Sequence, residues 1–272
     1  MVWFLAFFVY PFLYSAFLSF HSFDMLSAPE FTGLANYKRM TGDFLFTNAL
    51  GVTSYFAFGT TLPIMIFSLA FALFFNQRFP GKRVYLTIFL MACFMGLIPS
   101  SMAWKTLLHQ EYGLFNHLFI YSLGVEGPVN WLQNPQLAMP AMILVSLSSG
   151  IPYYAIYLIG GVASIPDDYY EVGRLEGADF FQRIRYIIIP SIKPIYKFVL
   201  VVALINGFQY MGIFFVMTRG GPVDSTRVLS LFIFNNAFDY FRFGYASALT
   251  LVLLLILVPV AYVSLRAGGG DR

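Results

Sequence analysis

The sequence has 272 residues, of which 59% are hydrophobic, 19% aromatic and 11% charged, and its formal net charge is +3. Ordinary globular chains have about 45–50% apolar and about 25% charged residues, so too few charges remain here to cover a water-facing surface. The aromatic content excludes a disordered chain, and the single cysteine excludes a disulfide scaffold. The composition therefore predicts an all-α membrane protein that crosses the bilayer several times.

Charged residues fall in clusters, and the charge-free segments between them are long enough for membrane-crossing helices of about 20 residues. The predicted spans are residues 2–20, 46–75, 84–104, 136–160, 196–217 and 244–265. We interpret residues 1–272 as one transmembrane domain with six helices. The first span starts at the first residues, which leaves open whether a natural N-terminal tail precedes them.

The connections between the spans differ in their basic residues, which are more frequent on the cytoplasmic side of a membrane. The first, third and fifth connections hold six of them: Lys38, Arg39, Lys105, Arg219, Arg227 and Arg242. The second and fourth connections and the C-terminal tail hold ten: Arg78, Lys82, Arg83, Arg174, Arg183, Arg185, Lys193, Lys197, Arg266 and Arg272. We therefore expect the second set to be cytoplasmic, with both termini inside.

Sequence signals of a reaction centre are missing. The chain has no phosphate-binding loop of the form G-x-x-x-x-G-K-[ST], no Cys/His cluster of metal-binding spacing and no G-x-S-x-G nucleophile motif. The charge-free segments contain no ionisable group of the kind that ion-coupled transporters need within the membrane. We predict no catalytic residue, metal or cofactor and no nucleic-acid binding, and we expect any uphill transport to take its energy from another subunit.

The connection over residues 161–194 is the most structured polar segment. Ser164 and Asp167 have the spacing of a capping box, and Pro166 fits the first turn of a helix. Gly177 is expected to end this helix, because glycine readily adopts the positive φ found there. A second short helix is predicted from Ala178 to Ile187. A docking element and a solvated loop on the membrane surface both remain open as interpretations.

Two prolines follow the second short helix. Pro190 and Pro194 are predicted to separate it from the fifth span, because a proline inside a helix removes one hydrogen bond and clashes with the preceding turn.

The same connection resembles the EAA loop of permease subunits in binding-protein-dependent ABC importers. The family pattern is E-A-A-x-x-D-G-A, five residues, then F-x-x-I-x-L-P. In register with it are Glu171, Gly177, Ala178, Ile187 and Pro190. The departures are Val172 and Gly173 for the alanines, Glu176 for Asp, Ile184 for Phe and Ile189 for Leu. Of these, Gly173 lowers helix propensity, so we expect a softer helix than usual.

The resemblance covers most of the chain. Segments similar to loops of the sugar-type permeases are FTGLANYKRM (31–40), YGLFNHL (112–118), NWLQNPQLA (130–138), TRGGPVDST (218–226) and AFDYFRFGYASAL (237–249). The chain is similar to the maltose and glycerol-phosphate importers. The resemblance implies a bacterial inner membrane, two ATP-binding-cassette subunits, a second, different permease, an extracytoplasmic solute-binding protein and a carbohydrate solute.

The resemblance also implies that the first loop helix inserts into a cleft on an ATPase subunit. The residues assigned to this contact are Tyr169, Tyr170, Glu171, Arg174, Leu175, Gly177 and Ala178. Glu171 would face a basic or hydrogen-bonding group, while the two tyrosines and Leu175 would fill the cleft. The alternative for Glu171 is an exposed ion pair with Arg174, three residues away, worth only about 0.3–0.5 kcal/mol.

Polar residues in the fifth and fourth spans are candidates for the solute path. Asn206, Gln209 and Tyr210 are spaced i, i+3 and i+4, and amides with a ring suit sugar hydroxyls and apolar sugar faces. Tyr153 continues a similar stripe in the fourth span. For the amides, hydrogen bonding between helices is an equally good interpretation, and for Ser146 and Ser149 we prefer packing between helices.

Other functions remain open at this point. A secondary transporter or channel is disfavoured by the missing ionisable groups, and a membrane enzyme or assembly scaffold by the missing reactive cluster. An importer of a non-sugar solute such as a glycerol phosphate is a further alternative.

Overall fold

The computed structural model describes residues 1–77, 79–124 and 127–266, and only the backbone of 119–121, 123 and 263–266. Arg78 and Arg272, counted above for orientation, lie outside the described residues. The N-terminal elements are α1 (Val2–Phe4), η1 (Leu5–Val9), α2 (Tyr10–Leu18), β1 (His21–Ser22), β2 (Glu30–Phe31) and α3 (Ala35–Gly42). The central elements are α4 (Phe44–Asn76), α5 (Lys82–Phe94), α6 (Leu97–Leu107), α7 (Leu114–Leu123) and α8 (Pro135–Ala163). The C-terminal elements are α9 (Asp167–Leu175), α10 (Phe180–Arg183), η2 (Ile184–Ile188), α11 (Ile189–Gln209), α12 (Gly212–Met217), α13 (Leu229–Phe234), η3 (Asn235–Asp239) and α14 (Phe243–Arg266).

Four helical segments are long and apolar enough to cross a membrane. They are Phe44–Asn76, Pro135–Ala163, Phe180–Met217 and Phe243–Tyr262. The first two coincide with the spans predicted at 46–75 and 136–160 to within three residues at each end. Asn134 starts the second of them, since its side chain accepts a hydrogen bond from the Gln136 amide at 2.9 Å. The first predicted span is a shorter apolar helix, Val2–Leu18.

The third predicted span, 84–104, coincides with a bent pair of helices instead of one straight helix. Helices α5 and α6 meet at an angle of 97° with a break at Met95 and Gly96. Pro99 explains the break, because it has no N–H to donate to the carbonyl four residues earlier. The proline is visible in the sequence, so the bend had a signal that hydropathy alone misses.

The fifth predicted span, 196–217, begins earlier and is interrupted. Helices α10, η2 and α11 follow one another without a break from Phe180 to Gln209, and α12 resumes after Tyr210 and Met211. Pro190 lies in the first turn of α11 and Pro194 inside it, so neither separates the short loop helix from the span as predicted. A π-helical segment, Ile184–Ile188, precedes the prolines, and such segments absorb local irregularities in the hydrogen-bond ladder.

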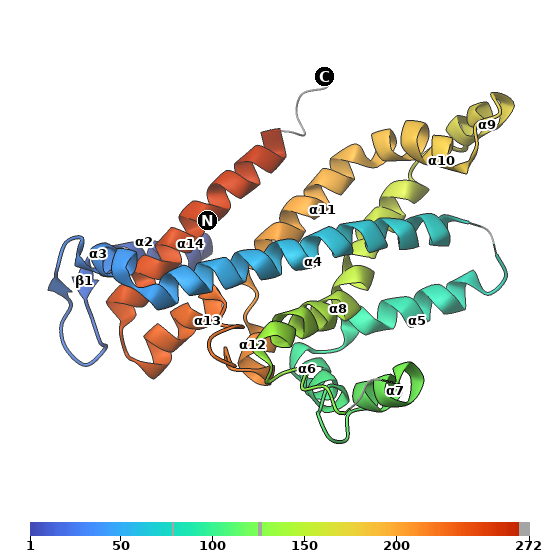
Figure 1. Ribbon diagram of the computed structural model, residues 1–272. Coiled ribbons are helices and arrows are strands. Elements are labelled where there is room, and N and C mark those ends of the chain that lie inside the picture. The colour runs from blue at the N-terminus through green and yellow to red at the C-terminus, as the bar shows by residue number, and fades with distance from the viewer. Residues whose placement is uncertain (78, 125–126, 267–272) are drawn as a thin grey trace.

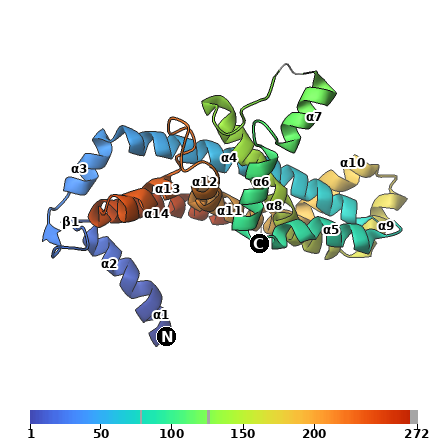
Figure 2. The same cartoon turned by 90° about the horizontal axis from the view of Figure 1, so that it is seen from below.

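The long helices form the centre of the molecule (Figure 1). Helix α4 packs along α8 and α11, and α14 packs against α11. Gly207 permits the close approach of α11 to α4, because a Cβ there would lie 3.0 Å from the Ala57 Cα. Seen from below in Figure 2, the N-terminal helix projects from this bundle. Its large apolar side chains, among them Trp3, Phe4 and Phe7, are exposed, which fits a lipid or protein environment.

The segment 218–226 and the first residue of α13 are held against α4 by hydrogen bonds. The Thr53 hydroxyl accepts from the Leu229 amide at 2.7 Å, and the Asn48 amide donates to the Asp224 carbonyl at 3.0 Å. Asp224 also forms an ion pair with Arg227 at 2.8 Å. This connection is therefore an ordered cap on the end of the bundle opposite α9 (Figure 1).

Candidate functional site

Helix α9 lies at one end of the molecule, beyond the last turns of α8 (Figure 1). The predicted capping box does not form. Ser164 belongs to the end of α8, where its hydroxyl donates to the Gly161 carbonyl at 2.8 Å, and Pro166 is the N-cap of α9. A capping box forms instead at the next helix, where Asp179 accepts from the Gln182 amide at 2.7 Å and Gln182 accepts from the Asp179 amide at 2.8 Å.

Gly177 ends α9 as the sequence predicts, with φ at +73°. The Ala178 amide donates to the Gly173 carbonyl at 2.8 Å, and the Gly177 amide donates to the Arg174 carbonyl at 3.1 Å. These two bonds make a Schellman motif, which stops a helix and reverses the chain within three residues. The turn sets the direction in which α9 points from the bundle.

The two faces of α9 differ. Tyr169, Val172 and Leu175 follow one another at spacings of three and are exposed, Leu175 by 88%. We call these three residues the apolar stripe. Tyr170 lies on the opposite face against the core of α4, α8 and α11, where burial raises the pKa of its phenol. Of the three residues expected to fill a partner's cleft, Tyr169 and Leu175 are therefore exposed, whereas Tyr170 is turned toward the core.

Charged residues of α9 are exposed as well. The guanidinium of Arg174 donates from Nε to the Tyr170 carbonyl at 3.3 Å, and the structure records no ion pair between it and Glu171, both of which it describes. The exposed pair considered from the sequence is therefore absent from the described contacts.

Gly173 has a packing role that helix propensity does not reveal. It is buried, and a Cβ there would lie 2.8 Å from the Ile187 Cδ1 atom. The glycine thus lets α9 lie directly on η2, the start of the long helical path that ends at Gln209. This contact joins the loop to the fifth span.

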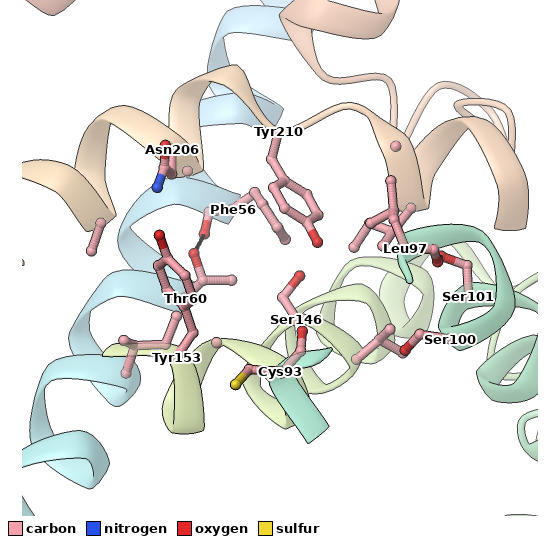
Figure 3. Close-up of a pocket in the computed structure, with 18 of the residues that line it drawn as sticks. Phe56, Thr60, Cys93, Leu97, Ser100, Ser101, Ser146, Tyr153, Asn206 and Tyr210 are labelled. Carbon is pink, nitrogen blue, oxygen red and sulfur yellow. Dashed lines mark hydrogen bonds between the residues drawn. The ribbon is translucent and has the colours of Figure 1, made fainter. Parts of the chain in front are cut away.

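A cavity of about 510 Å³ lies among α4, α5, α6, α8 and the α11–α12 break (Figure 3). All four residues predicted for the solute path line it: Tyr153, Asn206, Gln209 and Tyr210. Asn206 also donates to the Tyr154 hydroxyl at 2.9 Å, so it bridges two helices and faces the cavity at once. Tyr210 ends α11 with ψ at 121°, so it leaves the helical face that Asn206 and Gln209 share.

The broken helices contribute residues that the sequence did not single out. Met95 and Leu97, on either side of the α5–α6 break, line the cavity, and Met211 and Gly212 do so at the α11–α12 break. Gly212 lies against the Leu97 side chain, so the two breaks touch. Cys93 also lines the cavity, and its thiol donates to the Leu90 carbonyl at 2.8 Å.

The wall of the cavity combines apolar side chains with polar groups that carry no charge. Its polar groups are hydroxyls, amides and phenols, and no Asp, Glu, Lys, Arg or His is among the described residues that line it. Such a set can hydrogen-bond hydroxyl groups and stack on apolar ring faces. It lacks the acid–base pairs and metal ligands from which reaction centres are built.

Comparisons with known proteins agree with this architecture. The model of the family described as "Binding-protein-dependent transport system inner membrane component" matches residues 39–266. The probable ABC transporter permease protein YesP of Bacillus subtilis is 34% identical over 261 residues, which cover 94% of this chain and 83% of the relative. The trehalose/maltose transport system permease protein MalF of Thermococcus litoralis is 32% identical over 268 residues, covering 97% and 89%.

A solved structure shares the fold. The crystal structure of a bacterial alginate ABC transporter in complex with an alginate pentasaccharide-bound periplasmic protein contains a chain with a TM-score of 0.84. The match covers 100% of this chain and 93% of that one at 20% identity, so it concerns the fold alone. The family match over most of the sequence and the identities above 30% lead to one conclusion: this chain belongs to the inner membrane components of binding-protein-dependent transport systems.

Proposed function

We propose that this chain is the channel-forming permease subunit of an ABC importer, which moves a sugar or oligosaccharide inward and has no catalytic activity of its own. The observation that carries the proposal is one helical path, Phe180–Gln209, that begins beside the exposed stripe of α9 and ends in the wall of an uncharged cavity. A docking surface and a solute site are thereby joined by one rigid element. The name of the trehalose/maltose relative supports a sugar as the solute.

Helix α9 is the proposed contact with the ATPase. Two ATP-binding-cassette subunits would serve the complex, one for this chain and one for its partner permease. The apolar stripe fills a cleft on the ATPase, with Glu171 and Arg174 at its edge and the turn of Gly177 and Ala178 holding the helix in place. Exposed apolar anchors ringed by polar groups are the usual composition of such contacts.

The proposed orientation puts α9 in the cytoplasm of a bacterium. The connection between α4 and α5 lies at the same end of the molecule as α9 (Figure 1), and both connections are rich in basic residues. With six spans, the bent pair α5–α6 and the N-terminal helix included, both termini are cytoplasmic. The cap formed by residues 218–226 then faces outward, where a solute-binding protein would dock.

A second, different permease is the proposed partner within the membrane. The N-terminal helix contacts α14 through α2 and leaves its first turns exposed. Apolar surfaces of this kind are covered by lipid or by another subunit. The cavity would then be shared between the two permeases, and the solute would pass between them.

In this account, ATP-driven closure of the two ATPase subunits moves α9, and the continuous path to Gln209 carries that movement to the cavity. The helical path Phe180–Gln209 then has two arrangements, and ATP bound to the ATPase subunits sets the equilibrium between them. The breaks at Tyr210–Met211 and Met95–Gly96 are the points at which the cavity wall can change shape.

Two alternatives are less well supported. An ion-coupled carrier or channel would use ionisable groups within the membrane, and the described wall of the cavity has none. An importer of glycerol phosphate would need a cation for the phosphate, and the same wall offers only neutral groups.

The test is purification of this chain from its native membrane in mild detergent, with identification of its stoichiometric partners by mass spectrometry. An ATP-binding-cassette subunit together with a second permease, and ATP-dependent sugar uptake when the complex is reconstituted with its binding protein, are the expected results. A chain that runs alone, in a preparation that keeps other membrane complexes whole, would contradict the proposal.

A further inference from the structure

The described residues that line the cavity include no charged side chain. Other hollows described at the surface do carry charges: Arg39, Asp43 and Arg242 line one beside α3, and Asp168 and Glu176 line one beside α9. Charged residues therefore line other hollows of the described structure and are missing from the described wall of this cavity. The neutral wall is a chemical property that a solute entering it has to match.

A charged solute would lose its hydration in this cavity without gaining a counter-charge. Moving a carboxylate or phosphate from water to a neutral site in the membrane is costly unless a cation pairs with it. A sugar hydroxyl exchanges one hydrogen bond for another and has no such cost. The wall therefore disfavours charged solutes whatever their shape.

Ser146 supplies an independent sign that a polar ligand belongs here. The residue is 8% exposed, lines the cavity, and its hydroxyl has no hydrogen-bond partner among the described residues. Figure 3 shows the side chain pointing into the cavity, toward the region where the Tyr210 hydroxyl ends. Buried hydroxyls are nearly always paired, so an unpaired one that faces a cavity indicates a partner inside it.

We propose that the cavity selects uncharged sugars over their acidic counterparts and that the Ser146 hydroxyl hydrogen-bonds one hydroxyl of the bound sugar. The inference rests on the proposed function and goes beyond it, since it names the charge class of the solute and a specificity residue on α8. Tyr210, across the cavity, offers a ring face and a second hydroxyl to the same ligand.

The charge class is tested by uptake into proteoliposomes that contain the whole complex and its binding protein. The probes are pairs that differ by one carboxylate: glucose with glucuronate, galactose with galacturonate, and the short oligomers of each. Import of an uncharged member at a rate at least tenfold above its acidic counterpart is the expected result. Import of an acidic sugar at an equal or higher rate would overturn the inference and leave sugar import standing, whereas the absence of ATP-dependent uptake of every sugar would count against the proposed function itself.

The role of Ser146 is tested with deoxy analogues of the transported sugar. In the wild type, one deoxy analogue should bind about fivefold more weakly than the parent sugar, as expected for one lost hydrogen bond. Ser146→Ala should lower the affinity for the parent sugar by the same factor. It should not lower the affinity for that analogue any further. A purely structural effect of the substitution would lower the affinity for the parent sugar and for every analogue by the same factor. That result would overturn the assignment.

Thr61 provides a matched control on α4. Its hydroxyl is also buried and without a partner among the described residues, but Thr61 is not part of the cavity wall. Thr61→Val removes a buried hydroxyl with little change of shape, and the sugar affinity should stay within twofold of the wild type. An equal loss of sugar affinity in Thr61→Val and Ser146→Ala would show that both losses come from removing a buried hydroxyl and not from a lost contact with the sugar.

Discussion

The α9 turn and the cavity are two regions of the molecule that are built in opposite ways. The α9 turn is local: the stripe, Gly177 and the two hydrogen bonds that close the helix come from ten consecutive residues, 169–178. The cavity is assembled from α4, α5, α6, α8, α11 and α12, which meet only in the folded chain. In the proposed function, the first region binds a partner protein and the second binds a small solute. A docking surface can thus be formed by one short segment, whereas the solute site requires several helices to meet.

The two regions are joined by the path from Phe180 to Gln209. Gly173 packs on Ile187 at its beginning, and Asn206 bonds Tyr154 near its end. Substitutions at the α9 turn should therefore impair coupling and leave solute affinity intact. Substitutions in the cavity should lower solute affinity and leave coupling intact.

The largest effect is expected from Gly177→Val. A β-branched residue at φ of +73° is strained by roughly 1–2 kcal/mol, and relief of that strain would turn α9 away from its partner. ATP-dependent uptake should fall more than tenfold while expression and thermal stability in detergent change little. Gly33→Val is the control, because Gly33 also has a positive φ, +59°, and open space around it, but lies before α3. Wild-type uptake by Gly177→Val would refute the importance of this turn.

A somewhat smaller effect is expected from Leu175→Asp. The leucine is 88% exposed, so the change should not disturb folding, but it puts a charge into the proposed interface. Affinity for the ATPase subunit, measured by binding of the purified subunit to permease in detergent, should fall about tenfold. Leu26→Asp is a matched control, since Leu26 is 89% exposed in the β1–β2 connection. Equal affinities of the two variants would contradict docking through the stripe.

Gln209→Ala and Tyr210→Ala should act on the solute instead. Loss of one amide or one ring from the cavity wall should raise the apparent KM for sugar uptake about fivefold, with kcat changed by less than twofold. Kinetics of uptake in proteoliposomes provide the measurement, and Gln77→Ala at the exposed end of α4 is the control. A lower kcat with an unchanged KM would assign these residues to coupling.

The smallest effect is expected from Gly173→Ala. The new Cβ would press on the Cδ1 atom of Ile187, which is the end of a flexible side chain and can rotate away. Alanine also favours the helix by up to about 1 kcal/mol over glycine. Uptake should therefore stay within twofold, and the melting temperature in detergent should not fall. A loss as large as that of Gly177→Val would mean that the contact between α9 and η2 tolerates no change.

Much of the α9 region could be predicted because its determinants are adjacent in the chain. Gly177 signals the helix end, and the alternation of apolar and charged residues signals the helix. The capping box was predicted at the wrong helix, because Ser164 is used by the preceding helix and Asp179 has the same local pattern. Tyr170 was assigned to the outer face since spacing alone does not reveal which side of a short helix meets the core.

The cavity could be predicted only in part. Asn206, Gln209, Tyr210 and Tyr153 stand out as polar residues in apolar helices, and all four do line it. The bend at Met95–Gly96 has a local signal in Pro99, whereas the break at Tyr210–Met211 lies beside the contact of Gly212 with Leu97, which no local pattern contains. Ser146 was assigned to packing, because a serine in a membrane helix usually bonds within its own helix or to a neighbour. Ser146 differs from such a serine because its hydroxyl has no hydrogen-bond partner among the described residues of the folded chain.

The central claim is that α9 docks on an ATPase, and photo-crosslinking tests it most directly. A photoreactive amino acid is placed at position 175 in the membrane-embedded complex, with position 26 as the control, and the adducts are identified by mass spectrometry. The account predicts an adduct between position 175 and an ATP-binding-cassette subunit that is absent from position 26. Adducts of position 175 with lipid alone, in membranes where the ATPase subunit copurifies with this chain, would contradict it.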